Sequence, residues 1–165
     1  MRIAACLALL AVAALLAPRG GAEEELNGGI LGTWRLVSRE MIDRKLRPPP
    51  HLVGLLTYTK EFRNFNVSWA DAQGKRFTIA SIRKYSLTGE AYAETSLHDL
   101  VHDELGGKPV RYEAANAKGS AGAMHTEEGV EFQLPLFGEP YLVFRGDTMT
   151  ATREGEFIDH WERVK

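Results

Sequence analysis

Hydrophobic and polar residues alternate along most of the chain with a period of two, which is typical of β-strands with one buried face. In the segment 31–40, Trp34 and Leu36 fall on one face of such a strand, and Arg35 and Arg39 fall on the other. Further segments with strand-forming residues between turn signals are 54–59, 64–69, 76–85, 130–134, 141–145, 148–153 and 157–164. The pattern predicts an all-β fold, an antiparallel up-and-down barrel of about eight strands.

The middle of the chain has a different pattern. Leu97, Leu100, Val101 and Leu105 recur at the three-to-four-residue spacing of an amphipathic helix. We therefore expect one short helix over 97–105, inserted in the middle of the barrel. The stretch 114–123 is built of small and polar residues with no apolar face, and we expect a loop there. The sequence leaves open the order of strands between residues 86 and 140.

The first residues have the composition of a secretory signal peptide. Met1 and Arg2 precede an apolar run that ends near Leu16, and small residues follow it as far as Ala22. We expect a signal peptide over 1–22, a flexible leader over 23–29 and a single β-barrel domain over 30–165. An uncleaved membrane anchor is the alternative. Cleavage would give an exported protein, periplasmic or secreted, with no membrane span after processing.

Cysteine content and charge restrict the possible partners. The only cysteine, Cys6, lies inside the apolar run, so the remaining chain has no disulfide and depends on packing for its stability. The formal net charge is −2, with charges of both signs scattered along the chain. This balance argues against a nucleic-acid partner. The sequence contains no phosphate-binding loop, dinucleotide fingerprint or nucleophile elbow, so we expect no cofactor.

Three short segments carry a family resemblance. They are Leu-Gly-Thr-Trp-Arg-Leu-Val-Ser at 31–38, Gly-Leu-Leu-Thr-Tyr-Thr at 54–59 and Trp-Glu-Arg at 161–163. Together they resemble the bacterial lipocalin-like domain family, whereas residues 86–140 show no such match. The resemblance implies that Gly32 and Trp34 close one end of the barrel. It also implies that an arginine packs over the tryptophan by a cation–π contact, Arg163 first and Arg35 second.

Two groups of residues are candidates for binding. Aromatic residues on the expected strands fill the core or line a ligand cavity, and the sequence does not decide between the two. The residues that we expect to line such a cavity are Tyr58, Trp69, Phe77, Tyr85, Phe132 and Tyr141. On the expected helix, His98 and His102 have the spacing of a zinc pair but lack a third ligand, so we expect no metal site there.

Three functions follow from this reading. The first is a carrier that binds a small apolar or amphipathic molecule inside the barrel. The second is a plugged barrel that binds another protein through its surface. The third is an enzyme whose polar site is assembled inside the barrel from residues distant in sequence, although no catalytic motif points to one. The oligomeric state and the identity of the ligand stay open.

Overall fold

The computed structural model describes residues 29–113 and 116–165, and every regular element in them is a strand. The expected signal peptide and all but the last residue of the expected leader lie outside the described residues. The strands are β1 (Gly32–Met41), β2 (Leu46–Arg47), β3 (Leu52–Tyr58), β4 (Phe62–Ala70), β5 (Arg76–Leu87), β6 (Ala91–Asp103), β7 (Lys108–Glu113), β8 (Lys118–Thr126), β9 (Gly129–Gln133), β10 (Tyr141–Arg145), β11 (Thr148–Arg153) and β12 (Phe157–Arg163).

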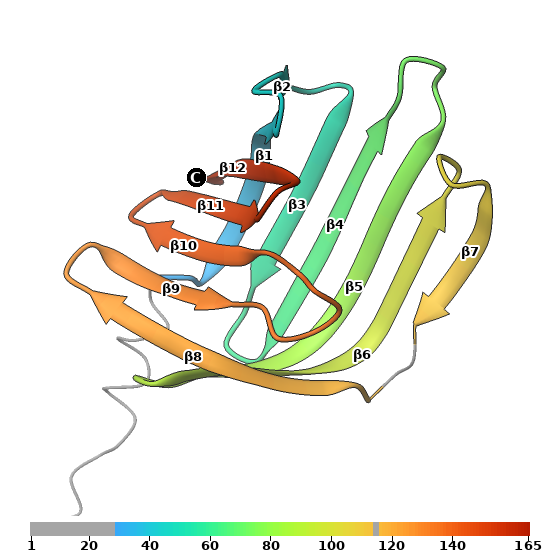
Figure 1. Ribbon diagram of the computed structural model, residues 1–165. Helices are drawn as coiled ribbons and strands as arrows, with labels where there is room; N and C mark the ends of the chain where they lie inside the picture. Colours follow the sequence, from blue (N-terminus) through green and yellow to red (C-terminus); the bar gives the residue numbers. More distant parts are fainter. Residues whose placement is uncertain (1–28, 114–115) are drawn as a thin grey trace, which may run out of the picture.

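The strands form a closed antiparallel barrel (Figure 1). The order is β12-β11-β10-β9-β8-β6-β5-β4-β3-β1, and β1 pairs with β12 to close the ring. Strands β2 and β7 pair only with β1 and β6, and both lie at the same end of the molecule (Figure 1). The expectation of an all-β antiparallel barrel is confirmed, but ten strands form the ring instead of eight.

The expected helix over 97–105 is wrong, because these residues belong mainly to β6 and the turn after it. A β-bulge interrupts the alternation of this strand. Ile82 of β5 pairs with His98 and Arg83 pairs with Ser96, so that Leu97 is an extra residue in β6. Such a bulge shifts the alternation by one residue. The inward positions are therefore even-numbered before Leu97 and odd-numbered after it, and of the four apolar residues that suggested a helix only Val101 faces the barrel interior.

The expected loop over 114–123 is also wrong from residue 118 onward, where β8 begins. Its side chains alternate between half-buried and exposed, but the half-buried residues Gly119, Ala121 and Ala123 are too small to mark an apolar face. Gly119 shows why small residues are needed. A Cβ atom at this position would lie 2.9 Å from side-chain atoms of Pro135 and Leu136. The unpredicted strands β6 and β8 account for the increase from eight strands to ten.

A second bulge reverses one expected orientation in β1. Leu36 pairs with Trp161 of β12, whereas Ser38 pairs with His160, so Val37 is the extra residue. Strict alternation puts Arg39 on the face opposite Trp34, but the bulge turns it into the barrel, where it is buried. The bulge thus brings a charged side chain into the interior.

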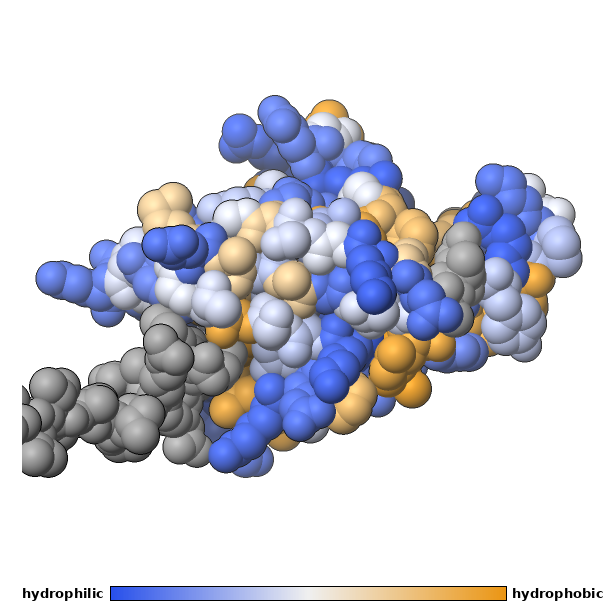
Figure 2. Space-filling model, turned by 90° about the horizontal axis from the view of Figure 1, so that it is seen from below, coloured by the Kyte–Doolittle hydropathy of each residue, from blue (hydrophilic) through white to orange (hydrophobic). Residues whose placement is uncertain are grey.

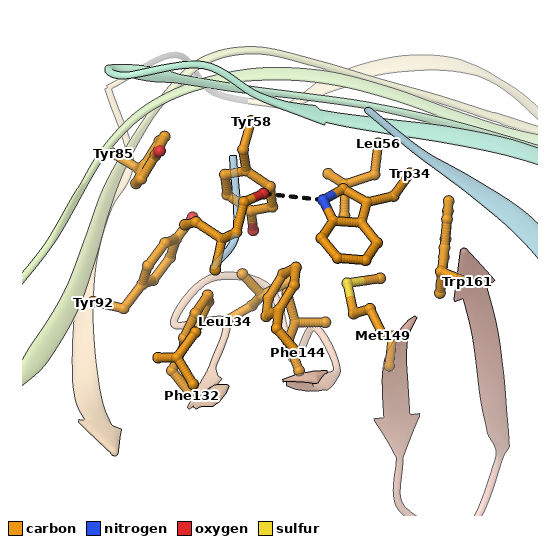
Figure 3. Packing of buried hydrophobic residues seen from close by; sticks show 14 of the residues in the cluster. Trp34, Leu56, Tyr58, Tyr85, Tyr92, Phe132, Leu134, Phe144, Met149 and Trp161 are labelled. Carbon is orange, nitrogen blue, oxygen red and sulfur yellow. Dashed lines mark hydrogen bonds between the residues drawn. The ribbon is translucent and has the colours of Figure 1, made fainter. Parts of the chain in front are cut away.

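The hydrophobic core fills one half of the barrel (Figure 3). Trp34 and Tyr58 both pack edge-on against Phe144, with ring centroids 5.2 and 5.8 Å apart. Tyr92 stacks on Phe132 at 4.2 Å. Trp34 and Tyr92 come from the beginning of β1 and β6, and Tyr58 and Phe144 come from the end of β3 and β10, which meet at one end of the barrel, with Phe132 of β9 stacked beside them. This end is therefore plugged by aromatic side chains.

Candidate functional site: a cavity with a charged floor

The other half of the barrel encloses a cavity of about 880 Å³. Its walls include Trp69 from the end of β4, Phe77 from the beginning of β5, Val101 from the end of β6 and Phe157 from the beginning of β12. Its inner boundary is shared with the aromatic plug, because core residues such as Trp161 also line it. A barrel that is filled at one end and hollow at the other can hold a small molecule without losing its core.

One wall of the cavity is a stack of planar groups. Trp69 and Phe77 are stacked with ring centroids 4.4 Å apart. The guanidinium group of Arg39 lies over Trp69 at 4.7 Å and over Phe157 at 3.8 Å. Arg39 also donates two hydrogen bonds to Asp159, from Nε to Oδ1 at 2.6 Å and from Nη2 to Oδ2 at 2.8 Å. The ion pair is buried and internally neutral, so the wall presents mainly ring faces to the cavity.

A layer of charged side chains lies between part of the plug and the cavity. Arg83 donates hydrogen bonds to Glu94 at 2.5 Å, to Asp99 at 2.7 Å and, at a short contact, to Glu139. Arg63 lies 3.4 Å from Glu94 and 3.6 Å from Glu139. We refer to these five residues as the ionic floor. Arg63, Arg83, Asp99 and Glu139 all border the cavity.

Burial governs the protonation of this layer. It raises the pKa of Glu139, and the two guanidinium groups oppose that effect only in part. It also raises the pKa of Tyr58 and Tyr92 well above the usual tyrosine range, so both phenols are neutral. The Tyr92 hydroxyl donates to Glu94 at 3.0 Å. The Glu139 carboxylate is therefore easier to protonate than an ordinary glutamate.

The aromatic residues that we expected to line a ligand cavity are divided between the hollow half and the plugged half of the barrel. Trp69 and Phe77 border the cavity. Tyr58, Tyr85 and Phe132 are buried in the plug. Tyr141 lies on β10 and is half-buried, outside both groups.

The charged residues of the interior were missed by the sequence analysis. A signal for two of them exists in the alternation. Arg63 has the same parity as Phe65 and Val67, and Arg83 has the same parity as Ile79 and Tyr85, so both fall on the apolar face of their strands. Glu139 lies in the connection between β9 and β10, where no periodic pattern indicates its direction.

Gly32, Trp34 and Arg163 meet at the plugged end. The Arg163 guanidinium lies 4.1 Å from the Trp34 ring centroid. Trp34 Nε1 donates to the Ile30 carbonyl at 2.9 Å, the hydrogen bond drawn as a dashed line at Trp34 in Figure 3. A Cβ atom on Gly32 would lie 3.0 Å from Arg163 Nη1, and the φ of Gly32 is +117°, which favours glycine. Arg35, the second candidate for this contact, instead pairs with Glu162 on the exposed surface.

The two histidines do not come together. His98 and His102 lie on β6 after its bulge and share its outer face, where four strand residues span about 13 Å. His98 packs near the Tyr112 ring, and His102 lies 3.7 Å from Glu104. Within residues 29–113 and 116–165, no three metal-binding side chains are grouped as a site.

The fold and the cavity define a closed antiparallel β-barrel with a hollow interior, which is consistent with a lipocalin-like barrel. Comparisons with known protein families, with curated proteins and with solved structures give no match. The described part of the chain contains no helix that is long and apolar enough to cross a membrane.

Proposed function

We propose that this protein is an exported, lipocalin-like carrier that binds a small apolar or amphipathic molecule in the hollow half of its barrel. The observation that carries the proposal is the cavity of about 880 Å³. Pockets that bind small molecules typically have volumes of roughly 300–1,000 Å³, with apolar walls and a few polar groups. A barrel that needed only a packed core would gain stability by filling this space.

The cavity walls favour an apolar ligand body. The flat surface made by Trp69 and Phe77 suits a ring or a chain, and Phe65, Val67 and Val101 extend the apolar lining. Polar groups are concentrated at the ionic floor and at the mouth. An amphipathic ligand would therefore bury its apolar body between these two regions.

Export is the second part of the proposal, and it rests on the sequence. The apolar run within 1–22 has the composition of a cleaved signal peptide. The only cysteine lies in that run, so the processed protein would need no redox chemistry in an oxidising compartment. The amino terminus and cellular location of the protein made in its own host would test this part.

The first experiment is native mass spectrometry of the protein purified from its own host, followed by denaturation and identification of any released molecule. A stoichiometric small molecule is the expected result. Two tryptophan variants on neighbouring residues of β6 then test the location. Val101 borders the cavity, whereas Leu100 lies on the opposite face of the strand.

We expect Val101→Trp to fill the cavity and weaken ligand binding by about tenfold or more, since it removes space that the ligand occupies. Leu100→Trp adds the same side chain outside the barrel and should leave binding unchanged. Equal affinity in both variants would refute binding inside the cavity. Absence of any bound or binding apolar molecule would refute the carrier function.

A second candidate function, a barrel enzyme, is favoured by the ionic floor, because a buried carboxyl group with a raised pKa borders a cavity. An enzyme would be indicated if a molecule added to the protein were recovered in chemically altered form. Surface binding of another protein has less support. The hydrophobic residues on the face shown in Figure 2 are interspersed with hydrophilic ones and form no single patch.

A further inference from the structure

We infer that the ligand of this cavity carries a cationic amine, and that Glu139 on the ionic floor binds it. The inference rests on the proposed carrier function and specifies the chemistry of the ligand's polar end. It follows from the position of Glu139, from the charge of the floor and from the shape of the space above it.

Glu139 is the member of the ionic floor that a ligand reaches most easily. Its side chain is 16% exposed, whereas the exposed fractions of Arg63, Arg83, Glu94 and Asp99 are between 0 and 4%. Its Oε2 atom accepts the hydrogen bond from Arg83. No group in the described chain donates a hydrogen bond to Oε1, so this oxygen can accept one from a ligand.

The ionic floor has one carboxylate more than it has guanidinium groups. Arg63 and Arg83 face Glu94, Asp99 and Glu139, so the layer carries one net negative charge when all five groups are ionised. The other buried ion pair that borders the cavity, Arg39 with Asp159, is balanced. A buried excess charge is costly unless it is compensated. A ligand ammonium group would compensate it, whereas a carboxylate would double it.

The two arginines nevertheless do not make the floor an anion site. All of their ion pairs are to carboxylates of the protein itself, and although Nε of each lacks a hydrogen-bond partner, both side chains are only 2% exposed. The arginines nearer the mouth, Arg47, Arg111 and Arg153, are exposed to solvent. Water and salt weaken their field, so they contribute less to selectivity than a charge on the buried floor.

The apolar walls of the cavity determine the chemistry of the part of the ligand that lies beyond its amine. Trp69, Phe77 and Val101 line the same cavity as Glu139, so the rest of a cation bound there contacts apolar walls. Its body is therefore apolar, either a chain or a ring system. Loss of water around the ammonium group is offset by a charge-assisted hydrogen bond to Glu139 in a region of low dielectric constant.

The test compares three probes with the same ten-carbon chain and different ends: decylamine, 1-decanol and decanoate. Their affinities are measured by titration calorimetry at about pH 7.5, where an alkyl amine is protonated and a carboxylic acid is ionised. We expect decylamine to bind about tenfold or more tightly than 1-decanol, and decanoate to bind most weakly. Equal binding of amine and alcohol would overturn the inference.

Glu139→Gln removes the excess charge and keeps the shape. In this variant the preference of amine over alcohol should disappear and decanoate should bind more tightly than it does to the natural protein. Glu128→Gln is the matched control, because Glu128 pairs with Arg145 on the exposed surface. Since the comparison of the three probes on the natural protein is itself decisive, the inference remains testable if Glu139→Gln is unstable.

The outcomes separate the inference from the function on which it rests. If decanoate binds most tightly, the carrier function stands and the amine assignment is wrong. If none of the three probes binds, the carrier function fails and the assignment fails with it. If decylamine binds preferentially but Glu139→Gln and Glu128→Gln retain that preference equally, the amine does not contact Glu139 and the inference is overturned.

Discussion

Strands β1 and β12 are joined by two arginine–carboxylate pairs that differ mainly in burial, and they allow a controlled measurement of what a buried charge costs. Arg39 and Asp159 lie inside the barrel, with side chains 8% and 4% exposed. Arg35 and Glu162 lie outside it, with side chains 66% and 54% exposed and a separation of 3.5 Å. Both pairs bridge the seam that closes the barrel.

We expect Asp159→Asn to lower the free energy of unfolding by about 3–5 kcal/mol, because it leaves a buried guanidinium without its counter-charge. Arg39→Met should cost a similar amount, since it leaves the carboxylate unpaired. Glu162→Gln should cost less than about 1 kcal/mol, which is typical of exposed pairs. With a urea dependence of about 2 kcal/mol per molar, the Asp159 variant should unfold at a urea concentration lower by roughly 2 M.

Replacement of both buried partners gives the sharpest test. Desolvation raises the pKa of Asp159 even though Arg39 lies beside it, which indicates that the pair gains little over an apolar replacement. The double variant Arg39→Met with Asp159→Leu should therefore be close to the natural protein in stability, within about 1–2 kcal/mol. The measurement is urea unfolding followed by tryptophan fluorescence. If each single variant costs no more than Glu162→Gln, the reasoning about burial is refuted.

Three further variants test other parts of the fold. Arg163→Ala should lower the unfolding free energy by about 2–4 kcal/mol, because it removes the cation–π contact with Trp34 and hydrogen bonds to backbone carbonyls; a loss no greater than that of Arg145→Ala, an exposed control, would contradict this role. Deletion of Leu97 removes the bulge and should abolish the near-ultraviolet circular dichroism of the folded barrel, because Asp99 and the residues after it would turn outward; Leu97→Ala keeps the register and should preserve the spectrum. Burial raises the pKa of Glu139 above its ordinary value of 4.5, so the folded protein binds this proton more tightly than the unfolded chain does. Between pH 4.5 and the raised pKa, the free energy of unfolding should consequently fall as pH rises. In Glu139→Gln the free energy of unfolding should depend less on pH over that range. An identical pH dependence in both proteins would show that Glu139 does not titrate there.

The sequence predicts this fold well wherever side chains alternate without interruption. In β10 and β11, the expected and observed bounds coincide, because the residues alternate between glycine- or proline-containing turns. Alternation fails as a guide at the bulges. One extra residue, Leu97, shifts the alternation of β6 by one position, and the residues of β5 whose pairing defines the bulge are distant in sequence.

Strand β8 shows a different limit. Its residues carry almost no apolar signal, and it exists because its backbone pairs with β6 on one side and β9 on the other. Gly119 contributes by leaving room for Pro135 and Leu136. A strand specified by its neighbours in this way cannot be found from its own side chains.

The candidate site was predictable only in part. Strand aromatics indicate a barrel interior, but whether a given ring fills the plug or borders the cavity depends on how far along the barrel it lies. Tyr58 and Trp69 come from neighbouring strands and end up in opposite halves. The ionic floor depends on contacts between residues as distant as Arg63 and Glu139. No local pattern encodes such a contact.

The pairing of β1 with β12 also has a consequence for the order in which the chain folds. The other neighbours in the ring are adjacent in the chain or separated by one short strand, so they can form early as hairpins. The seam alone joins the two ends, with Trp34 opposite Arg163. During synthesis, which proceeds from the amino terminus, the barrel cannot close until the last strand has been made. Until then the inner faces of the earlier strands are open to solvent and available to chaperones.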